Sequence, residues 1–177
     1  KTYLTKEDAL KGLQQGELGF PMIIKPRWGS ASIGIEVVET KEELELAHQL
    51  LSIRLKRSIL SDAGESFTDQ VILFQEKLTG QEFGMDVLND FNGNYVKCFP
   101  KKKLAMRDGE TDKAQLIEDE RFTKVGEKVG ASLKHIANLD MDVFDTPDGL
   151  YVLELNPRFG GGDPFTHQGG VNIPAIL

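Results

Sequence analysis

The chain has 177 residues, of which 40% are hydrophobic and 28% are charged, and this composition fits one domain or two small lobes that share a site. A net charge of −7 argues against a general nucleic-acid or membrane-surface binder. The single cysteine, Cys98, excludes an internal disulfide framework, a cysteine-rich zinc site and a Cys-x-x-Cys redox pair. Because the sequence has neither a long apolar run nor a signal peptide, we expect a cytoplasmic protein without a membrane segment.

In chain order, the sequence first predicts a short helix and then a hairpin. Thr5, with Asp8 three residues later, is a weak form of the capping box that begins a helix. Residues 20–25 and 35–38 then predict two strands on either side of a loop of small side chains at 26–34.

A second capping box, Thr40 with Glu43, predicts the next helix. The apolar residues of this helix recur at helical spacing, and they are Leu44, Ala47, Leu51 and Leu55. A polar connector at 61–69 follows. We expect it to divide an N-terminal lobe, residues 1–70, from a C-terminal lobe, residues 71–177.

The C-terminal part predicts a meander of strands, a helix and a last hairpin. Residues 71–78 and 82–88 are strand-like, and Asn92-Gly93 predicts a two-residue hairpin turn before a return strand at 95–99. The helix that follows has an apolar stripe made of Phe122, Val125, Val129, Leu133 and Ile136. Consecutive strands look antiparallel and the helices would cover one face, so the order predicts an α+β fold and not a doubly wound parallel sheet.

The last hairpin carries the most informative pattern of the sequence. Glu154 and Asn156 lie two positions apart on one strand, so their side chains project from the same face. A three-residue turn at 147–149 would place Asp142 opposite Glu154, whereas a four-residue turn would place Leu153 there. Two carboxylates and an amide oxygen are hard ligands that suit Mg²⁺. The alternative is a solvated acidic face, and the converging third side chain favours the metal.

A loop of glycine and small residues at 29–34, preceded by Lys25, predicts a phosphate-binding flap. It is not a P-loop, because the lysine precedes the glycines and a strand follows them. The alternative is an ordinary hairpin tip with a surface lysine. Further along, Lys101, Lys103 and Arg107 could add charge to the same phosphates, or could be a solvated edge that blocks strand pairing.

With the flap, the strand end Gln75-Glu76-Lys77-Leu78, the break Gly80-Gln81-Glu82 and the stretch Glu154-Leu155-Asn156-Pro157-Arg158 in this order, the chain resembles the ATP-grasp superfamily. The resemblance runs over about residues 20–170. Within the superfamily, the chain looks most like the ATP-grasp domains of the carbamoyl-phosphate synthase large chain and their unassigned relatives. The resemblance implies an ATP-grasp fold, with two α+β lobes, largely antiparallel sheets and the nucleotide in the cleft between the lobes.

The resemblance also implies roles for the matching residues. Lys25 would bind ATP phosphates under the flap, the Glu76 carbonyl and the Leu78 N–H would bond the adenine edge, and Glu82 would bind the ribose. The implied cofactor-binding residues are Lys25, Gly29, Ser30, Ser32, Gly34, Gln75, Glu76, Lys77, Leu78, Glu82 and Lys103. The implied ligands of Mg²⁺, or of Mn²⁺ in its place, are Asp142, Glu154 and Asn156. Arg158 would face the γ-phosphate or an acyl phosphate, and is the implied catalytic residue.

ATP-grasp enzymes mostly activate a carboxylate as an acyl phosphate, which an amine or ammonia then attacks. The resemblance therefore implies an ATP- and Mg²⁺-dependent ligase domain like that of carbamoyl-phosphate synthase. Its partners would be ATP, a small carboxylate, an amine and the missing N-terminal domain of the same polypeptide, since a start at Lys1 suggests a fragment of a longer chain. It could also assemble into an oligomer.

Two other functions stay open at this point. One is an ATP-binding domain that no longer catalyses and serves regulation or assembly. The other is a small-molecule kinase, although no His-Arg-Asp or Asp-Phe-Gly motif is present. In the glycine-rich tail, Thr166 or His167 could touch the acceptor substrate, or the tail could be a mobile terminal loop.

Overall fold

A computed structural model describes residues 1–28, 34–57, 70–107 and 109–177, and the chain divides into two compact units, Lys1–Lys77 and Leu78–Leu177. The elements of the first unit are β1 (Thr2–Tyr3), α1 (Lys6–Gln14), β2 (Met22–Pro26), β3 (Glu36–Val38), α2 (Lys41–Leu55) and β4 (Ile72–Glu76). Those of the second are β5 (Gln81–Asn89), β6 (Tyr95–Arg107), β7 (Glu110–Leu116), α4 (Glu120–Leu133), β8 (Ala137–Thr146), β9 (Gly149–Asn156), α5 (Asp163–Gln168) and α6 (Ile173–Ile176). Among the described parts, no helix is long and apolar enough to cross a membrane.

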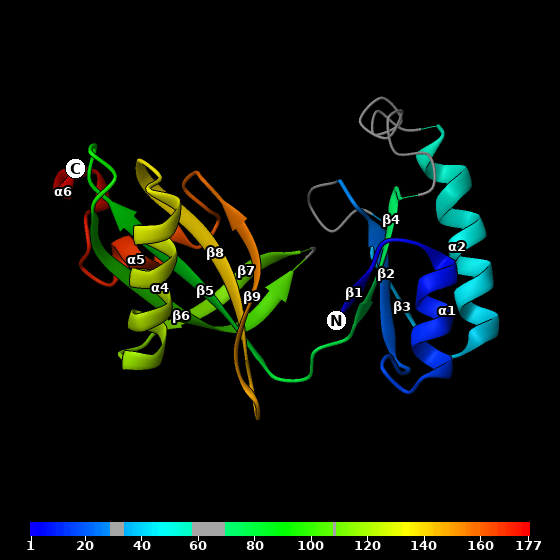
Figure 1. Cartoon of the computed structure of the whole chain (residues 1–177). Helices are drawn as coiled ribbons and strands as arrows, with labels where there is room; N and C mark the ends of the chain where they lie inside the picture. Colours follow the sequence, from blue (N-terminus) through cyan, green and yellow to red (C-terminus); the bar gives the residue numbers. More distant parts are fainter. Residues whose placement is uncertain (29–33, 58–69, 108) are drawn as a thin grey trace. The chain divides into compact units, whose positions relative to one another are not determined.

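The first unit is a four-stranded antiparallel sheet in the order β1-β4-β2-β3. Helices α1 and α2 run side by side against one face of it (Figure 1). Alternation along the strands puts Met22, Ile24 and Phe74 into the core, where they pack with Leu44 and Leu51 of α2. The apolar spacing predicted for α2 is therefore the face that this helix buries.

Strand β4 corrects the predicted boundary between the lobes. The prediction placed residues 71–78 in the C-terminal lobe, but β4 pairs with β1 and with β2 and so completes the first sheet. The boundary accordingly falls after Lys77 and not after residue 70.

Both predicted helix caps of the first unit form. The Thr5 hydroxyl accepts a hydrogen bond from the Asp8 N–H at 3.2 Å, and the Thr40 hydroxyl accepts one from the Glu43 N–H at 3.1 Å. The Glu43 carboxylate reaches back to the N–H of Glu39 at 2.7 Å, one residue before the cap. These bonds satisfy backbone donors that have no partner within the helix.

Replacing Thr40 by alanine is expected to lower the free energy of unfolding of the first unit by about 1 kcal/mol, because the cap bond to Glu43 is lost. Urea denaturation followed by circular dichroism measures the effect. Ser52→Ala is the matched control, since the Ser52 hydroxyl donates to the His48 carbonyl inside α2 and caps nothing. Equal losses in the two variants would contradict the capping role.

The second unit is a five-stranded antiparallel sheet in the order β7-β6-β5-β8-β9, with α4 lying across one face (Figure 1). Strand β5 is central, and its alternate residues Phe83, Met85 and Val87 pack beneath α4. From the helix, Phe122 is fully buried, while the buried Gly126 lies against Cys98 and allows the helix to approach the sheet closely. The free thiol of Cys98 is part of this core, and burial raises its pKa.

The apolar stripe predicted for α4 extends beyond the part of the helix that packs in the core. Phe122, Val125 and Val129 pack in the core, but Leu133 is 52% exposed and Ile136 is 60% exposed. The helix ends at Leu133, and Lys134 adopts a left-handed conformation with φ of 51°. The chain therefore turns away before the last two residues of the stripe can reach the sheet.

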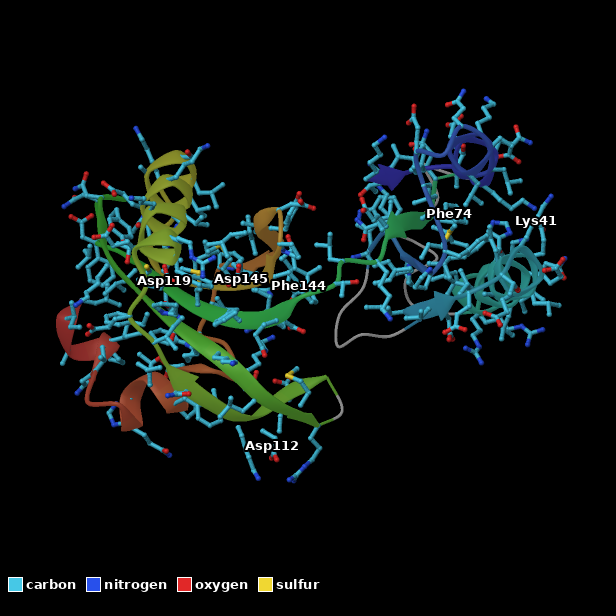
Figure 2. All side chains as sticks on the ribbon, turned by 90° about the horizontal axis from the view of Figure 1, so that it is seen from below. Lys41, Phe74, Asp112, Asp119, Phe144 and Asp145 are labelled. Carbon is cyan, nitrogen blue, oxygen red and sulfur yellow. The ribbon has the colours of Figure 1, made fainter. Side chains whose placement is uncertain are left out.

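A bidentate arginine ties the start of α4 to the end of the last hairpin. Figure 2 shows Asp119, the cap residue of α4, near Asp145 of β8. The Arg121 guanidinium donates to both Asp145 oxygens at 2.9 Å and to Asp119 at 2.8 Å. Such a fork fixes orientation as well as distance, so it sets where α4 begins on the sheet.

The turn between β5 and β6 is longer than predicted. The Gly93 N–H donates to the Asp90 carbonyl at 3.1 Å, and the Asp90 N–H donates to the Asn94 carbonyl at 2.8 Å, which encloses three residues instead of two. Gly93 has φ of 78°, the left-handed conformation that such a loop requires. The hairpin itself is confirmed.

Candidate active site

The face of the second sheet that turns away from α4 carries a continuous set of polar residues. On β5, Glu82, Gly84 and Asp86 alternate with the core residues, and the strand register aligns Gly84 with Lys101 on one side and Asp142 on the other. We call this surface the polar face, and define it by Glu82, Asp86, Lys101, Lys103, Asp140, Asp142, Glu154 and Asn156. Its carboxylates outnumber its ammonium groups, so it favours the binding of a cation.

The last hairpin has the predicted pairing of Asp142 with Glu154, but its turn differs from the predicted one. Its turn is a two-residue turn, because Thr146 pairs with Gly149, and the predicted three-residue turn is wrong. The Thr146 hydroxyl accepts from the Asp148 N–H at 3.2 Å and thereby holds the turn. A bulge between Asp142 and Val143 then shifts the pairing by one residue on β9. As a result Asp142 lies directly opposite Glu154.

The three predicted metal ligands lie together on the polar face. Asp142 is paired with Glu154 across the ladder, and the Asn156 amide donates to the Glu154 carboxylate at 3.0 Å. Two carboxylates and an amide oxygen are hard donors that suit Mg²⁺. Among the residues that the structure describes, no group of three or more His, Cys, Asp or Glu side chains is arranged to hold a metal ion. The amide of Asn156 would have to supply the third protein ligand.

Lys103 joins two of the predicted site residues. Its ammonium lies 2.5 Å from a Glu82 oxygen and 2.8 Å from an Asp142 oxygen, and its side chain is only 8% exposed. Burial alone would lower the pKa of Lys103, but the carboxylates of Asp142 and Glu82 outweigh that effect and raise it. Lys103 is therefore a charged group held between the residue predicted for the ribose and a residue predicted for the metal.

A fully buried charge pair lies beside this group. The Lys101 ammonium pairs with Asp86, and Thr166 of α5 completes the set by donating to Asp86 at 2.5 Å and accepting from Lys101 at 2.9 Å. The Asn138 amide also donates to Asp86, at 3.2 Å. The hydroxyl of Thr166, predicted as a possible contact of the acceptor, is thus taken up inside the protein. His167 is exposed.

Asp86 was not among the predicted site residues, although a signal was present. Asp86 shares the face of Glu82 by simple alternation, and a carboxylate on the central strand of a sheet needs a partner. The partners themselves were not readable, because Lys101 and Thr166 lie 15 and 80 positions further along the chain.

Arg158, the predicted catalytic residue, is held by a residue that the sequence analysis also missed. Its guanidinium donates to the Asp140 carboxylate at 3.0 Å, and the Arg158 side chain is 56% exposed whereas that of Asp140 is 16% exposed. A side chain at Gly160 would overlap the Asp140 carboxylate, so the glycine lets the tail close over it. Burial and repulsion from Asp142 raise the pKa of Asp140, and Arg158 opposes this shift.

In the first unit, Lys25 and Gln75 lie on the sheet face that the helices leave open, since their neighbours Ile24 and Phe74 are in the core. The Gln75 amide donates to the Thr2 hydroxyl at 2.8 Å and is therefore engaged within the unit. Glu76 ends β4, and Lys77 and Leu78 are the residues at which the two units join.

Gly34, the last residue of the predicted flap, has φ of 75°, which a side chain would strain. The other predicted flap residues, Gly29, Ser30 and Ser32, lie outside the described residues. In the second unit, Arg107 pairs with Asp112 at 2.9 Å on the β6–β7 hairpin.

Comparison with known proteins identifies the architecture. The family model described as the ATP-grasp domain matches residues 18–166. The biotin carboxylase domain of Hydrogenobacter thermophilus 2-oxoglutarate carboxylase, solved with MgADP, ADP and bicarbonate, superposes with a TM-score of 0.74 at 19% identity. The superposition covers 96% of this chain and 38% of the Hydrogenobacter thermophilus chain.

Biotin carboxylase from Campylobacter jejuni, in complex with β-γ-ATP, gives a TM-score of 0.69 at 19% identity over 96% of this chain and 38% of that chain. A pyruvate carboxylase variant from Rhizobium etli gives 0.67 at 18% identity, over 88% of this chain and 14% of that chain. The chain thus spans well under half the length of each of these proteins. At such identities the likeness shows the fold.

Proposed function

The chain belongs to the ATP-grasp family, and on this premise we propose that it is an ATP- and Mg²⁺-dependent ligase domain. It activates a carboxylate as an acyl phosphate, which an amine or ammonia attacks with release of phosphate. The reaction type proposed is that of carbamoyl-phosphate synthase.

The observation that carries this proposal is the pairing of Asp142 with Glu154, with Asn156 bonded to Glu154 and Arg158 two residues further on. Asp142, Glu154 and Asn156 would hold Mg²⁺, which would neutralise phosphate charge when bound. In phosphoryl transfer the protein mainly positions groups and neutralises charge, so no protein nucleophile is needed. The polar face offers oxygen ligands, ammonium groups and one exposed guanidinium for that purpose.

Each remaining residue has a task that follows from its chemistry. Arg158 presents its guanidinium to the transferred phosphoryl group and to the acyl phosphate, where negative charge accumulates. Glu82 binds the ribose hydroxyls, and Lys103 beside it supplies positive charge to the phosphates. From the first unit, Lys25 and the flap residues Gly29, Ser30, Ser32 and Gly34 bind phosphate, and residues 75–78 bind adenine.

Bicarbonate is the first carboxylate to consider. The structure of the Hydrogenobacter thermophilus biotin carboxylase domain contains bicarbonate together with MgADP. The rest of the polypeptide, including an N-terminal domain, would complete the substrate sites and any assembly of subunits.

The experiment follows the oxygen atoms of the carboxylate. The full-length protein is incubated with MgATP, ammonia or amines, and ¹⁸O-labelled bicarbonate or other carboxylates. A ligase transfers one labelled oxygen to the released phosphate, because the carboxylate oxygen that attacks the γ-phosphorus leaves with it. Phosphate release that needs both substrates supports the proposal. Stable phosphorylation of a hydroxyl would indicate a kinase, and nucleotide binding without release would indicate a regulatory domain.

A further inference from the structure

We propose that Lys103 is a positioning residue that holds Asp142 while no metal is bound and has to release it when a divalent cation binds. Lys103 thereby sets how tightly the site takes the cation and makes that affinity depend on the nucleotide. This inference rests on the function proposed above and deepens it, because it concerns the regulation of the same site.

The path of the lysine across the sheet is the first observation. Lys103 lies on β6 and Asp142 on β8, with β5 between them. The residue of β5 at this point is Gly84, which pairs with Asp142. A Cβ at Gly84 would lie 3.6 Å from an Asp142 oxygen and 3.6 Å from Cε of Lys103. Both are ordinary van der Waals distances, so the lysine passes directly over Gly84 to reach a strand two positions away, and a side chain larger than alanine there would enter its path.

The base of the lysine is held in place. The Gln81 amide donates to the Lys103 carbonyl at 2.9 Å and also to the Glu82 carbonyl at 3.0 Å. These bonds tie the backbone of β6 to the start of β5. A change of partner for Lys103 is consequently a movement of the side chain and not of the strand.

Competition with a cation follows from the charges. The ammonium is nearly buried between Glu82 and Asp142, where opposite charges are screened far less than in water. A divalent cation that takes the same Asp142 carboxylate either displaces the ammonium or sits beside a like charge. Both cost free energy, so Lys103 weakens the binding of the free metal.

Glu82 and the phosphates of a bound nucleotide are the groups that would attract the Lys103 ammonium once it has left Asp142. The ammonium also contacts Glu82, so it keeps a partner after it leaves Asp142. Phosphate groups of a bound nucleotide would attract it further from the metal ligand. Nucleotide and metal should therefore strengthen each other's binding through Lys103, and such coupling is reciprocal.

The test measures Mn²⁺ binding to the full-length protein by calorimetry and electron paramagnetic resonance, without turnover. Lys103→Met is expected to tighten Mn²⁺ binding by about 10-fold in the absence of nucleotide, a change that corresponds to loss of one competing ion pair. The enhancement of Mn²⁺ affinity by the non-hydrolysable analogue AMP-PNP is expected to shrink in this variant. Lys103→Arg keeps the charge and is expected to retain weak metal binding.

Lys102→Met is the matched control. It removes the same charge from the neighbouring position of β6, but Lys102 pairs with Phe83, whose side chain points to the opposite, apolar face of the sheet. Its effect on Mn²⁺ affinity should stay below about 2-fold, since only long-range electrostatics change. An unchanged Mn²⁺ affinity in Lys103→Met, or an equal change in Lys102→Met, would overturn the inference.

Glu154→Gln in the same titration separates this inference from the proposed function. If that substitution removes Mn²⁺ binding while Lys103→Met fails to tighten it, the metal site stands and the role of Lys103 falls. If Glu154→Gln leaves Mn²⁺ affinity intact, the cation binds elsewhere and the proposed function falls with it. Melting temperatures of all variants show whether each one is folded, and Lys103→Gln, which also removes the charge, takes the place of Lys103→Met should that variant not fold.

Discussion

Substitution of Glu154 by alanine is expected to lower MgATP turnover by at least about 10³-fold, because it removes one of the two carboxylates proposed to hold the metal. Glu154 lies on β9, the edge strand of its sheet, and is exposed. Its partners are the Asn156 amide and, across the ladder, Asp142, so the free energy of unfolding should change by less than about 0.5 kcal/mol. Phosphate release at saturating ATP and urea denaturation of the same preparation measure the two effects.

Glu127→Ala provides the matched control for this experiment. It removes the same charge from an exposed position on α4, which covers the opposite face of the sheet. We expect near-normal turnover in that variant. Near-normal turnover in Glu154→Ala as well would mean that the acidic hairpin is not where ATP chemistry takes place.

The last hairpin shows how far the sequence could predict the site. Alternation placed Glu154 and Asn156 on one face, and that follows from local geometry alone. The register to Asp142 depended on the turn, and the predicted turn was wrong. The bulge that restores the pairing could not be read from sequence, because Val152 and Leu153 are both apolar and equally suited to the unpaired position.

Non-local pairing explains the other differences. The polar connector at 61–69 was predicted to be a boundary. Strand β4 follows it, however, and pairs with β2, although β3 and α2 lie between these two strands in the sequence. Composition marks a change of surroundings along the chain and does not report which sheet a strand joins. For the same reason the buried pair of Lys101 with Asp86 was not predicted, although Asp86 lay in a predicted strand and Lys101 just beyond another.

Helix α4 shows a limit of prediction from local sequence pattern. The core-facing residues Phe122, Val125 and Val129 of α4 followed from periodicity, and the end of the helix did not. Leu133 and Ile136 continue the apolar spacing, yet Lys134 takes a left-handed conformation and ends the helix first. Periodicity describes the face that a helix would bury if it continued, whereas the termination is set by local backbone geometry.

Replacement of Arg158 by methionine is expected to lower kcat by about 10²- to 10³-fold, because its guanidinium neutralises charge that accumulates on the transferred phosphoryl group. Affinity for ADP, which lacks the γ-phosphate, should change by less than about 3-fold. Steady-state phosphate release and calorimetric titration with ADP measure the two quantities. Arg54→Met, at an exposed arginine of the first unit that pairs with Glu36, is the control.

Asp140→Asn tests whether the position of Arg158 matters as well as its charge. Asp140 is the partner of the guanidinium at 3.0 Å, and burial raises the pKa of this carboxyl, so its ionised form costs stability in the fold. We therefore expect the asparagine variant to melt no lower than wild type at neutral pH and yet to lose about 10-fold in kcat, because the guanidinium loses the charge that orients it. A loss of activity that tracks a lower melting temperature would instead make Asp140 a structural residue. An unchanged kcat would mean that Arg158 acts from its flexible side chain without help from the sheet.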